Sequence, residues 1–151
     1  MTTLEIYQKL EKIPFGKNFF TYLVCLKLPY FKSIKPYVLE LQEGHSVITM
    51  KDRRCVHNHL NTIHAIALCN LCEMAMAMTT EASIPKGLMY IPKGMTVEYK
   101  KKAKGDLRAI CNASPGDYQP GDMSTHVDVY NANEEIVMSA DIILNIKEII
   151  S

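Results

Sequence analysis

The sequence predicts a single α+β domain in which one long helix packs against an antiparallel sheet. Residues 62–82 are apolar over about six helical turns. The segments on both sides of this stretch alternate apolar and polar residues with a period of two, which is typical of strands. Short turns join successive strands of this kind, so we expect antiparallel pairing.

One or two short helices are expected before the first strand. In residues 2–12, Leu4, Tyr7 and Leu10 recur at helical spacing. A proline and a glycine interrupt this pattern, and residues 17–27 can form a second helix that ends as the next proline approaches. The N-terminal segment, residues 1–30, is therefore expected to be helical.

Two strands are expected before the long helix and four after it. The stretches YVLELQEG and SVITMKD form the first pair, with a turn at Gly44. After Pro85 the alternation returns in GLMYI, which stops at PKG, and in MTVEYKKKAKG, LRAICNA and STHVDVYNA. The last stretch, EIVMSADIILNIKE, is long enough for a strand with a bulge or bend.

Length and composition indicate one domain, residues 1–151, with its core in residues 31–151. A formal net charge of +1 argues against a nucleic-acid binder. The five cysteines show no spacing typical of a disulfide framework, which fits a reducing cytosol. The first residues do not read as a targeting signal, and no uninterrupted apolar run reaches the roughly 18–20 residues of a membrane span. We therefore expect a cytoplasmic protein.

The long helix is expected to be buried on most sides. A helix at a protein surface shows one apolar stripe, whereas this one is apolar nearly all round. Its many alanines and cysteines let a sheet approach closely. Because one curved sheet does not cover a whole helix, we expect a second subunit to cover the rest. A sheet wrapped around a long helix in paired subunits is the hotdog architecture, as a homodimer or dimer of dimers.

Within this helix Asn70 and Glu73 interrupt the apolar surface on one side. Burial of a carboxylate is costly unless it is paired or protonated, and burial raises its pKa. Glu73 is therefore a candidate acid, base or nucleophile. The alternative is an acid at a solvent-filled gap between subunits, or one paired with a lysine or arginine.

The start of the helix is a candidate site for a negative oxygen. Asn61 or Thr62 is expected to cap it, so that the free amides up to about Ala65 point outward. Such amides stabilise the oxyanion that forms when a thioester carbonyl is attacked. Glu73 lies two to three turns further along, so it would reach such a site only from a second subunit. The alternative is an ordinary capped helix.

The pattern Asn58-x5-His64-Ala65-Ile66-x6-Glu73 resembles the phenylacetyl-CoA-type branch of hotdog thioesterases, whose pattern is Asn-x5-His-Gly-Gly-x6-Asp. Together with LPYFKSIKPYVLEL, it looks like a thioesterase-like subgroup catalogued as a domain of unknown function. The resemblance covers residues 30–147. It implies an acyl-CoA thioesterase that needs no metal and no cofactor other than the coenzyme A of its substrate.

The resemblance also implies roles by position. The Ala65 N–H would polarise the thioester carbonyl, Glu73 would act as general base or nucleophile, Asn58 would orient the water or the acyl group, and His64 would fix the helix start. Ala65 and Ile66 stand where the family has glycine, and Ile66 is expected to narrow the acyl site.

The remaining residues expected to contact substrate lie within this pattern and on either side of it. The basic residues can pair with the phosphates of coenzyme A, although lysines in the KKKAK run can also protect an edge strand. The predicted substrate-binding set is Asn61, Ile66, Asn70, Arg53, Arg54, Lys100 and Lys102.

Other interpretations remain open at this stage. A non-catalytic protein that binds acyl-CoA or fatty acid is favoured by the replaced glycines. A hotdog dehydratase or hydratase would use His59 and Glu73, which are fourteen residues apart. Cys55, His57 and His59 alternate as zinc ligands would on a strand, although a polar strand end explains them better. Core packing explains the Cys-x-x-Cys of the helix better than redox chemistry.

Overall fold

The computed structural model describes residues 1–149, and the last two residues of the predicted domain lie outside this range. Its elements follow the expected order, with short 3-10 helices between them. They are α1 (Thr3–Leu10), α2 (Gly16–Lys27), η1 (Pro29–Ile34), β1 (Pro36–Gln42), β2 (His45–Met50), η2 (Arg54–Val56), α3 (Ala65–Ser83), β3 (Leu88–Tyr99), β4 (Leu107–Asn112), η3 (Pro115–Asp117), β5 (Gly121–Tyr130) and β6 (Ile136–Glu148).

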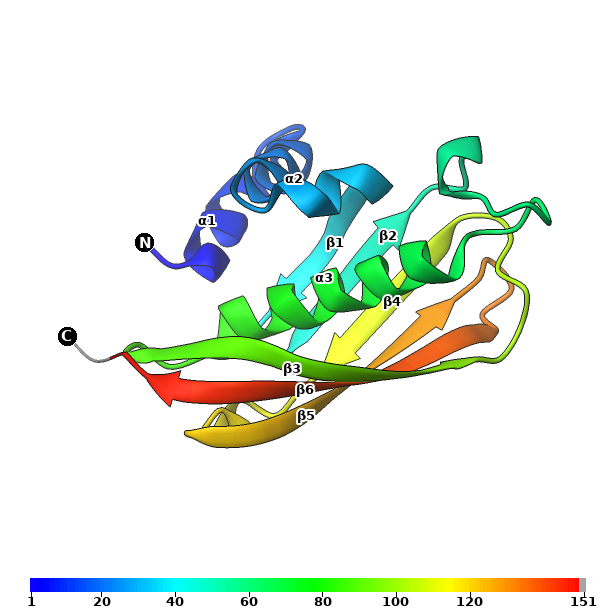
Figure 1. Ribbon diagram of the computed structural model, residues 1–151. Coiled ribbons are helices and arrows are strands. Elements are labelled where there is room, and N and C mark those ends of the chain that lie inside the picture. Colours follow the sequence, from blue (N-terminus) through cyan, green and yellow to red (C-terminus); the bar gives the residue numbers. More distant parts are fainter. Residues whose placement is uncertain (150–151) are drawn as a thin grey trace.

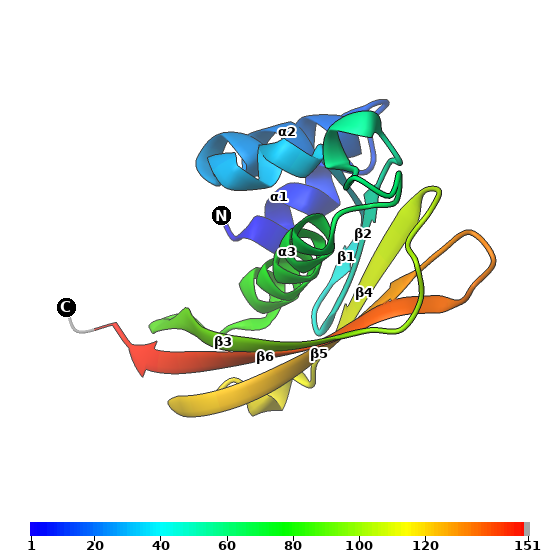
Figure 2. The same cartoon turned by 45° about the vertical axis from the view of Figure 1, so that its right-hand side comes forward.

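The six strands form one antiparallel sheet in the order β1-β2-β4-β5-β6-β3. The sheet curves around α3, and α1 and α2 lie on the opposite side of that helix, beside β1 (Figure 1). Figure 2 shows the same arrangement from a second direction, with α3 between the N-terminal helices and the sheet. The two edge strands are therefore β1 and β3. The α+β prediction of an antiparallel sheet around a long central helix is confirmed.

The strands after the helix differ from the predicted pattern in two places. The PKG stretch does not stop a strand, because β3 continues through it with a bulge in which Lys93 has no partner in the register. This strand ends at Tyr99, so the KKKAK run follows the edge strand instead of protecting it. The bulge expected in the last strand lies at Val137 of β6, between the pairs Tyr130↔Ile136 and Val129↔Met138.

Helix α3 is buried along most of its length, as its composition predicts. Two buried hydroxyl groups also connect it to the sheet. Ser46 of β2 donates to the Ala75 carbonyl over 2.8 Å, and Thr79 donates to Ser46 over 2.8 Å. These bonds satisfy polar groups that burial would otherwise leave unpaired. No helix within residues 1–149 is both long and apolar enough to cross a membrane.

The N-terminal helices cover the β1 edge through hydrogen bonds at a bulge. Leu39 is the extra residue there, since Val38 pairs with Ile48 and Glu40 with Val47. Two side chains from the helices donate to the exposed Leu39 carbonyl, and a third accepts from the Val38 N–H over 3.0 Å. These three side chains are Tyr7 (2.9 Å), Lys17 (2.7 Å) and Thr21.

The turn between β1 and β2 requires the glycine that predicted it. Gly44 has φ of +74°, and a Cβ at this position would lie 2.5 Å from the Ala113 carbonyl oxygen. Its N–H donates to the Ser83 hydroxyl at the end of α3 over 2.8 Å. The turn thereby fixes the far end of the helix against the sheet, which leaves the start of the helix to be positioned by other loops.

Candidate functional site

The start of α3 lies three residues later than the sequence predicts. Its N-cap is His64, whose Nδ1 accepts from the Ile66 N–H over 3.0 Å, so neither Asn61 nor Thr62 is the cap. Tertiary hydrogen bonds hold the preceding residues extended: the Ile63 N–H donates to the Ala103 carbonyl over 2.9 Å and the His64 N–H to the Val56 carbonyl over 2.8 Å. Ala65 is consequently the first helical residue, where its N–H has no acceptor within the helix.

Asn58 shapes the loop that leads into this helix. Its Oδ1 accepts from the Leu60 N–H over 2.9 Å and from the Thr62 N–H over 3.2 Å. Its Nδ2 donates to the Thr62 hydroxyl over 2.9 Å. An asparagine amide has two N–H groups, so Nδ2 keeps one of them for a ligand. The predicted part of Asn58 in orienting substrate stays a prediction, and its contacts show in addition how it stabilises the loop.

A carboxylate that the sequence did not single out holds the same loop in place. Asp52 bonds to Nε2 of His57 and accepts from the Gly105 N–H over 2.7 Å. The bond to His57, followed by the bond from Gly105, holds the pKa of Asp52 below its usual value. Asp52 thereby joins the segment after β2 to the loop before β4, and both segments border the helix start.

A cavity of about 380 Å³ opens between the start of α3 and the end of β3. This α3–β3 cavity brings together Asn58 and Ala65 from the predicted catalytic set and Lys100 and Lys102 from the predicted substrate-binding set. One further lining residue, Lys101, belongs to the KKKAK run, and the others, which the sequence did not suggest as site residues, are Leu60, Thr62, Ile63, Leu68, Tyr99 and Ala103. The cavity therefore joins a helix start, where partial positive charge favours an oxyanion, to a row of lysines.

The cations at the cavity differ in how far they are neutralised. Lys101 forms an ion pair of 2.5 Å with Glu135, and Lys100 lies 3.6 Å from Glu98. Among residues 1–149, Lys102 has no acidic side chain within ion-pair distance. The Lys100 and Lys101 amides both donate to the Val137 carbonyl, over 2.9 and 3.2 Å. The β6 bulge thus fixes the backbone that carries these side chains.

Tyr99 joins the cavity wall to α3. Its hydroxyl lies 3.4 Å from the Sγ of Cys69. This contact, and then burial, raises the pKa of Tyr99 to about 12. An aromatic residue at the end of an alternating strand, just before a basic run, was the only sequence signal for this position.

A second cavity, of about 210 Å³, lies on the other side of the helix start, between α3 and η1. It contains three of the predicted site residues, namely His64, Ile66 and Asn70. Ile66 is more than half exposed here, and Asn70 donates from Nδ2 to the Ser33 hydroxyl over 3.1 Å. The structure thus divides the predicted residues between two sides of one helix turn.

Three predicted substrate-binding residues line neither cavity. Arg53 donates from Nη2 to the Ile34 carbonyl over 2.9 Å and from Nη1 to the Cys55 Sγ over 2.8 Å, so its guanidinium ties the loop to η1. Arg54 and Asn61 are exposed. Asn61 adopts φ of +55° at the loop tip, a left-handed conformation that asparagine tolerates better than most residues.

Glu73 lies two turns beyond the helix start and lines neither of these cavities. It is half-buried, and it lies one turn after Cys69, whose Sγ is 3.4 Å from the Tyr99 hydroxyl of β3. Burial raises the pKa of Tyr90 of β3, and the charge of Glu81, followed by that of Glu73, raises it further. Among residues 1–149 Glu73 has no hydrogen bond or ion pair, so no lysine or arginine of its own subunit neutralises it.

The residues behind the zinc and redox alternatives are arranged differently from those patterns. Cys55 lies in the 3-10 turn of η2 rather than on a strand, and His57 is paired with Asp52. Within residues 1–149 no three His, Cys, Asp or Glu side chains are placed to hold one metal ion. Cys72 is fully buried in α3, and burial raises the pKa of its thiol. His59, which the dehydratase alternative needs, is exposed and lines neither cavity.

Solved structures show the same fold over most of the chain. A structural-genomics protein is 38% identical, with a TM-score of 0.86 over 97% of this chain and 99% of its own. A protein from Pseudomonas aeruginosa described as a probable thioesterase is 18% identical, with a TM-score of 0.77 over 85% and 93%. A variant of the phenylacetic acid degradation protein PaaI from Thermus thermophilus is 16% identical, with a TM-score of 0.67 over 77% and 96%.

The sequence comparisons place the chain in a family that has no assigned function. No curated protein matches the sequence. Residues 16–146 match the family described as a domain of unknown function, DUF4442. The likeness to the thioesterase structures shows the fold, and it confirms the hotdog fold of the single chain, whereas the expected pairing of subunits stays a prediction. The chain is therefore a member of the DUF4442 family with a hotdog fold.

Proposed function

We propose that the protein hydrolyses acyl-CoA thioesters at a site formed between two subunits. The observation that carries this proposal is the α3–β3 cavity, in which the first helical amide, Ala65 N–H, and the lysines after β3 face one space. An amide at a helix start stabilises an oxyanion, and lysines bind phosphates. A thioester of coenzyme A presents both groups. Proteins of the same fold described as thioesterases support this chemistry.

The position of Glu73 argues for a second subunit. Eight residues separate it from Ala65, which is about 12 Å along the helix axis. That is too far for both to act on one thioester from the same chain. Strand β3 is a sheet edge with twelve residues, and Cys69, one turn before Glu73 on α3, contacts its last residue, Tyr99. Pairing of two β3 edges would bring Glu73 of each chain toward the helix start of the other.

The proposed reaction uses few groups. The Ala65 N–H polarises the thioester carbonyl while Glu73 of the second subunit removes a proton from water. The water oxygen bonds to the carbonyl carbon, the C–S bond breaks, and the thiolate leaves and takes up a proton to give free coenzyme A and a carboxylic acid. Direct attack by the Glu73 carboxylate followed by hydrolysis of the anhydride gives the same products.

The test measures thiol release from a panel of straight-chain, branched and aryl acyl-CoAs. We expect turnover with at least one of them, and Glu73→Gln should lower kcat by at least about 100-fold, because general base catalysis contributes that much. Glu81→Gln is the matched control, since Glu81 is also half-buried two turns further along the same helix. It should keep most of the activity. Wild-type turnover by Glu73→Gln would contradict the mechanism.

The lysines are tested separately from the chemistry. Lys100→Gln with Lys102→Gln should raise KM for the acyl-CoA by about tenfold, since each lost phosphate contact to a lysine weakens binding. The same double variant should leave KM unchanged for the matching acyl-pantetheine, which lacks the nucleotide phosphates. An equal effect on both substrates would contradict phosphate binding by these lysines.

A second candidate function is binding of an acyl-CoA without hydrolysis. Two observations favour it: Ala65 and Ile66 replace the glycines of the related pattern, and Asn58 uses most of its hydrogen-bonding groups within its own loop. Saturable binding of an acyl-CoA, measured by calorimetry, with no thiol released across the panel would support this candidate and reject hydrolysis.

A further inference from the structure

An exposed apolar surface covers α2 and its two flanking turns. Of the sixteen large apolar side chains exposed within residues 1–149, eight lie between residues 13 and 30. Phe15 and Tyr30 are the most exposed of them, at 84% and 72%. We call this set the α2 patch, and it consists of Ile13, Phe15, Phe19, Tyr22, Leu23, Leu26, Leu28 and Tyr30.

The α2 patch follows the helix repeat. Phe15, Phe19, Tyr22 and Leu26 are spaced four, three and four residues apart, which aligns them along one face. The opposite face, including Phe20, packs on the core. Helix α2 is therefore apolar on both faces, although solvent covers only its outer one. Apolar side chains gathered in this way mark an interaction surface more often than scattered ones do.

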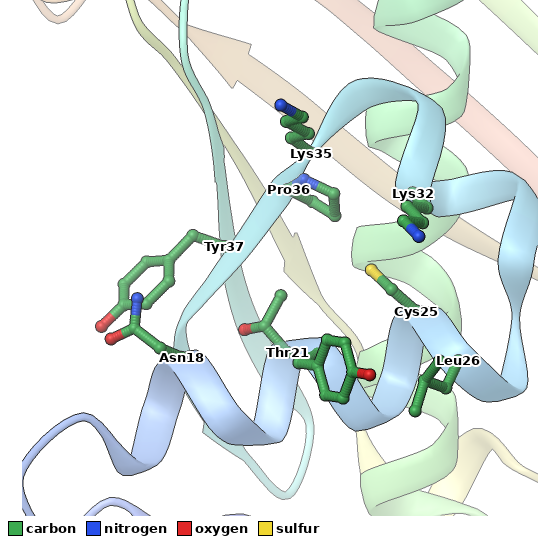
Figure 3. Close-up of a pocket in the computed structure, with 9 residues that line it drawn as sticks. Asn18, Thr21, Cys25, Leu26, Lys32, Lys35, Pro36 and Tyr37 are labelled. Carbon is green, nitrogen blue, oxygen red and sulfur yellow. The ribbon is translucent and has the colours of Figure 1, made fainter.

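The segment that carries the α2 patch is predominantly basic, with Glu11 and Glu40 at its two ends. Residues 12–39 contain five lysines and no aspartate or glutamate, while the whole chain carries a net charge of only +1. Two of these lysines, Lys32 and Lys35, border a cavity of about 220 Å³ between α2 and β1, together with Tyr22 and Leu26. In Figure 3 Lys32 and Lys35 lie on the η1 side of this cavity, and Leu26 lies across it on α2.

We propose that the α2 patch binds the surface of an anionic lipid bilayer. Aromatic and leucine side chains on one face of a helix enter the boundary between headgroups and acyl chains, and neighbouring lysines pair with lipid phosphates. In this mode of binding α2 would lie along the surface of the bilayer with its outer face toward the lipid. A second copy of the chain is a poorer partner, because a two-fold contact through this face would set its lysines against the same lysines.

The lysines and the aromatic side chains of this surface contribute to binding in different ways. The lysines supply attraction that depends on anionic lipid and weakens as salt screens it. The aromatic side chains supply burial that depends on neither lipid charge nor salt. The two contributions can therefore be removed independently. This proposal does not rest on thioesterase activity, and it holds or fails without it.

The test is flotation of the purified protein with vesicles of phosphatidylcholine, with and without phosphatidylglycerol. We expect binding to the anionic vesicles that falls as salt rises. Lys32→Gln with Lys35→Gln should lower the partition coefficient about fivefold for each lysine. Phe15→Ser with Phe19→Ser should lower binding at every salt concentration. Lys86→Gln with Lys147→Gln, two exposed lysines outside the α2 patch, is the matched control and should bind as the wild type does.

Two results would overturn the proposal. One is the absence of binding to anionic vesicles, or equal binding by the lysine variant and its control. The other is an oligomer in solution that the Phe15→Ser, Phe19→Ser variant dissociates, measured by light scattering, since a second copy would then occupy the α2 patch. Circular dichroism of each variant establishes that it is folded. Because both phenylalanines are exposed, their replacement should change the free energy of unfolding little.

Discussion

The two edges of the sheet differ in whether other elements of the chain cover them. At β1, three side chains from α1 and α2 bond to the backbone around the Leu39 bulge. At β3, within residues 1–149, no helix or strand pairs with the outer side of twelve residues that include exposed Ile91 and Tyr99. Open edges of this length lead to association unless they are blocked. The helices α1 and α2 therefore cover one edge, whereas the other stays open within residues 1–149, which is the edge that the proposed pairing of subunits uses.

The largest effect is expected from charge placed on the open edge. Ile91 and Gly94 pair with Asn145 and Ile143, so they lie on one face of β3, and a Cβ on Gly94 meets no atom within 4 Å. Ile91→Lys with Gly94→Lys should weaken self-association by at least about 100-fold, because like charges would face each other across the two-fold axis. Light scattering over a dilution series measures this.

The control for the open edge is Ile143→Lys, an equally exposed position on the inner strand β6. It should leave the oligomer intact, and both variants should unfold within about 0.5 kcal/mol of the wild type. Loss of activity together with dissociation would link the edge to the proposed site. An unchanged oligomer in the double variant would show that subunits associate elsewhere, or that the protein acts as a monomer.

A smaller effect is expected at the covered edge. Thr21 accepts from the Val38 N–H and donates to the Lys17 carbonyl over 2.9 Å. Thr21→Val keeps the shape but leaves a buried N–H unpaired, so the free energy of unfolding should fall by about 2 kcal/mol. Thr21→Ser keeps the hydroxyl, so its free energy of unfolding should fall by less. Denaturant titration measures both, and equal losses would show that packing rather than the hydrogen bond secures this edge.

The smallest effect concerns a histidine on β5, two strands in from the open edge. Hydrogen bonds to Asp141, and then Asp128, raise the pKa of His126 above its ordinary value of about 6.5. The stabilisation is therefore complete below about pH 6.5 and is lost as the pH rises through the raised pKa. Because His126 is half exposed, solvent screening keeps its contribution to the free energy of unfolding below about 1 kcal/mol. The stability difference between wild type and His126→Gln should shrink from pH 6 to about pH 8, and a constant difference would exclude this linkage.

The elements of this fold were largely readable from the sequence, whereas their ends were not. The apolar stretch predicted α3, but it placed the helix start at Thr62, because Asn61 and Thr62 are good caps. In the structure the Ala103 and Val56 carbonyls draw the chain into an extended conformation up to His64, which then caps the helix. Those acceptors come from segments that no local pattern connects to the helix.

In the candidate site, too, the sequence predicted some features and missed others. Asn58, Ala65 and Lys100 were predicted to take part in one site, and they line one cavity. Arg53 was predicted with them from its charge alone, and its guanidinium instead binds the Ile34 carbonyl. Tyr99 was missed because its importance depends on where β3 ends, and the basic run after it hid that boundary.

By itself the sequence determined the fold class, the buried long helix and the acid, Glu73, in its apolar middle, because side-chain periodicity and composition are local properties. Tertiary structure decided where α3 begins, which residues share the α3–β3 cavity and which sheet edge remains open. These depend on hydrogen bonds between segments distant in the chain, such as Asp52 to Gly105 and Ile63 to Ala103.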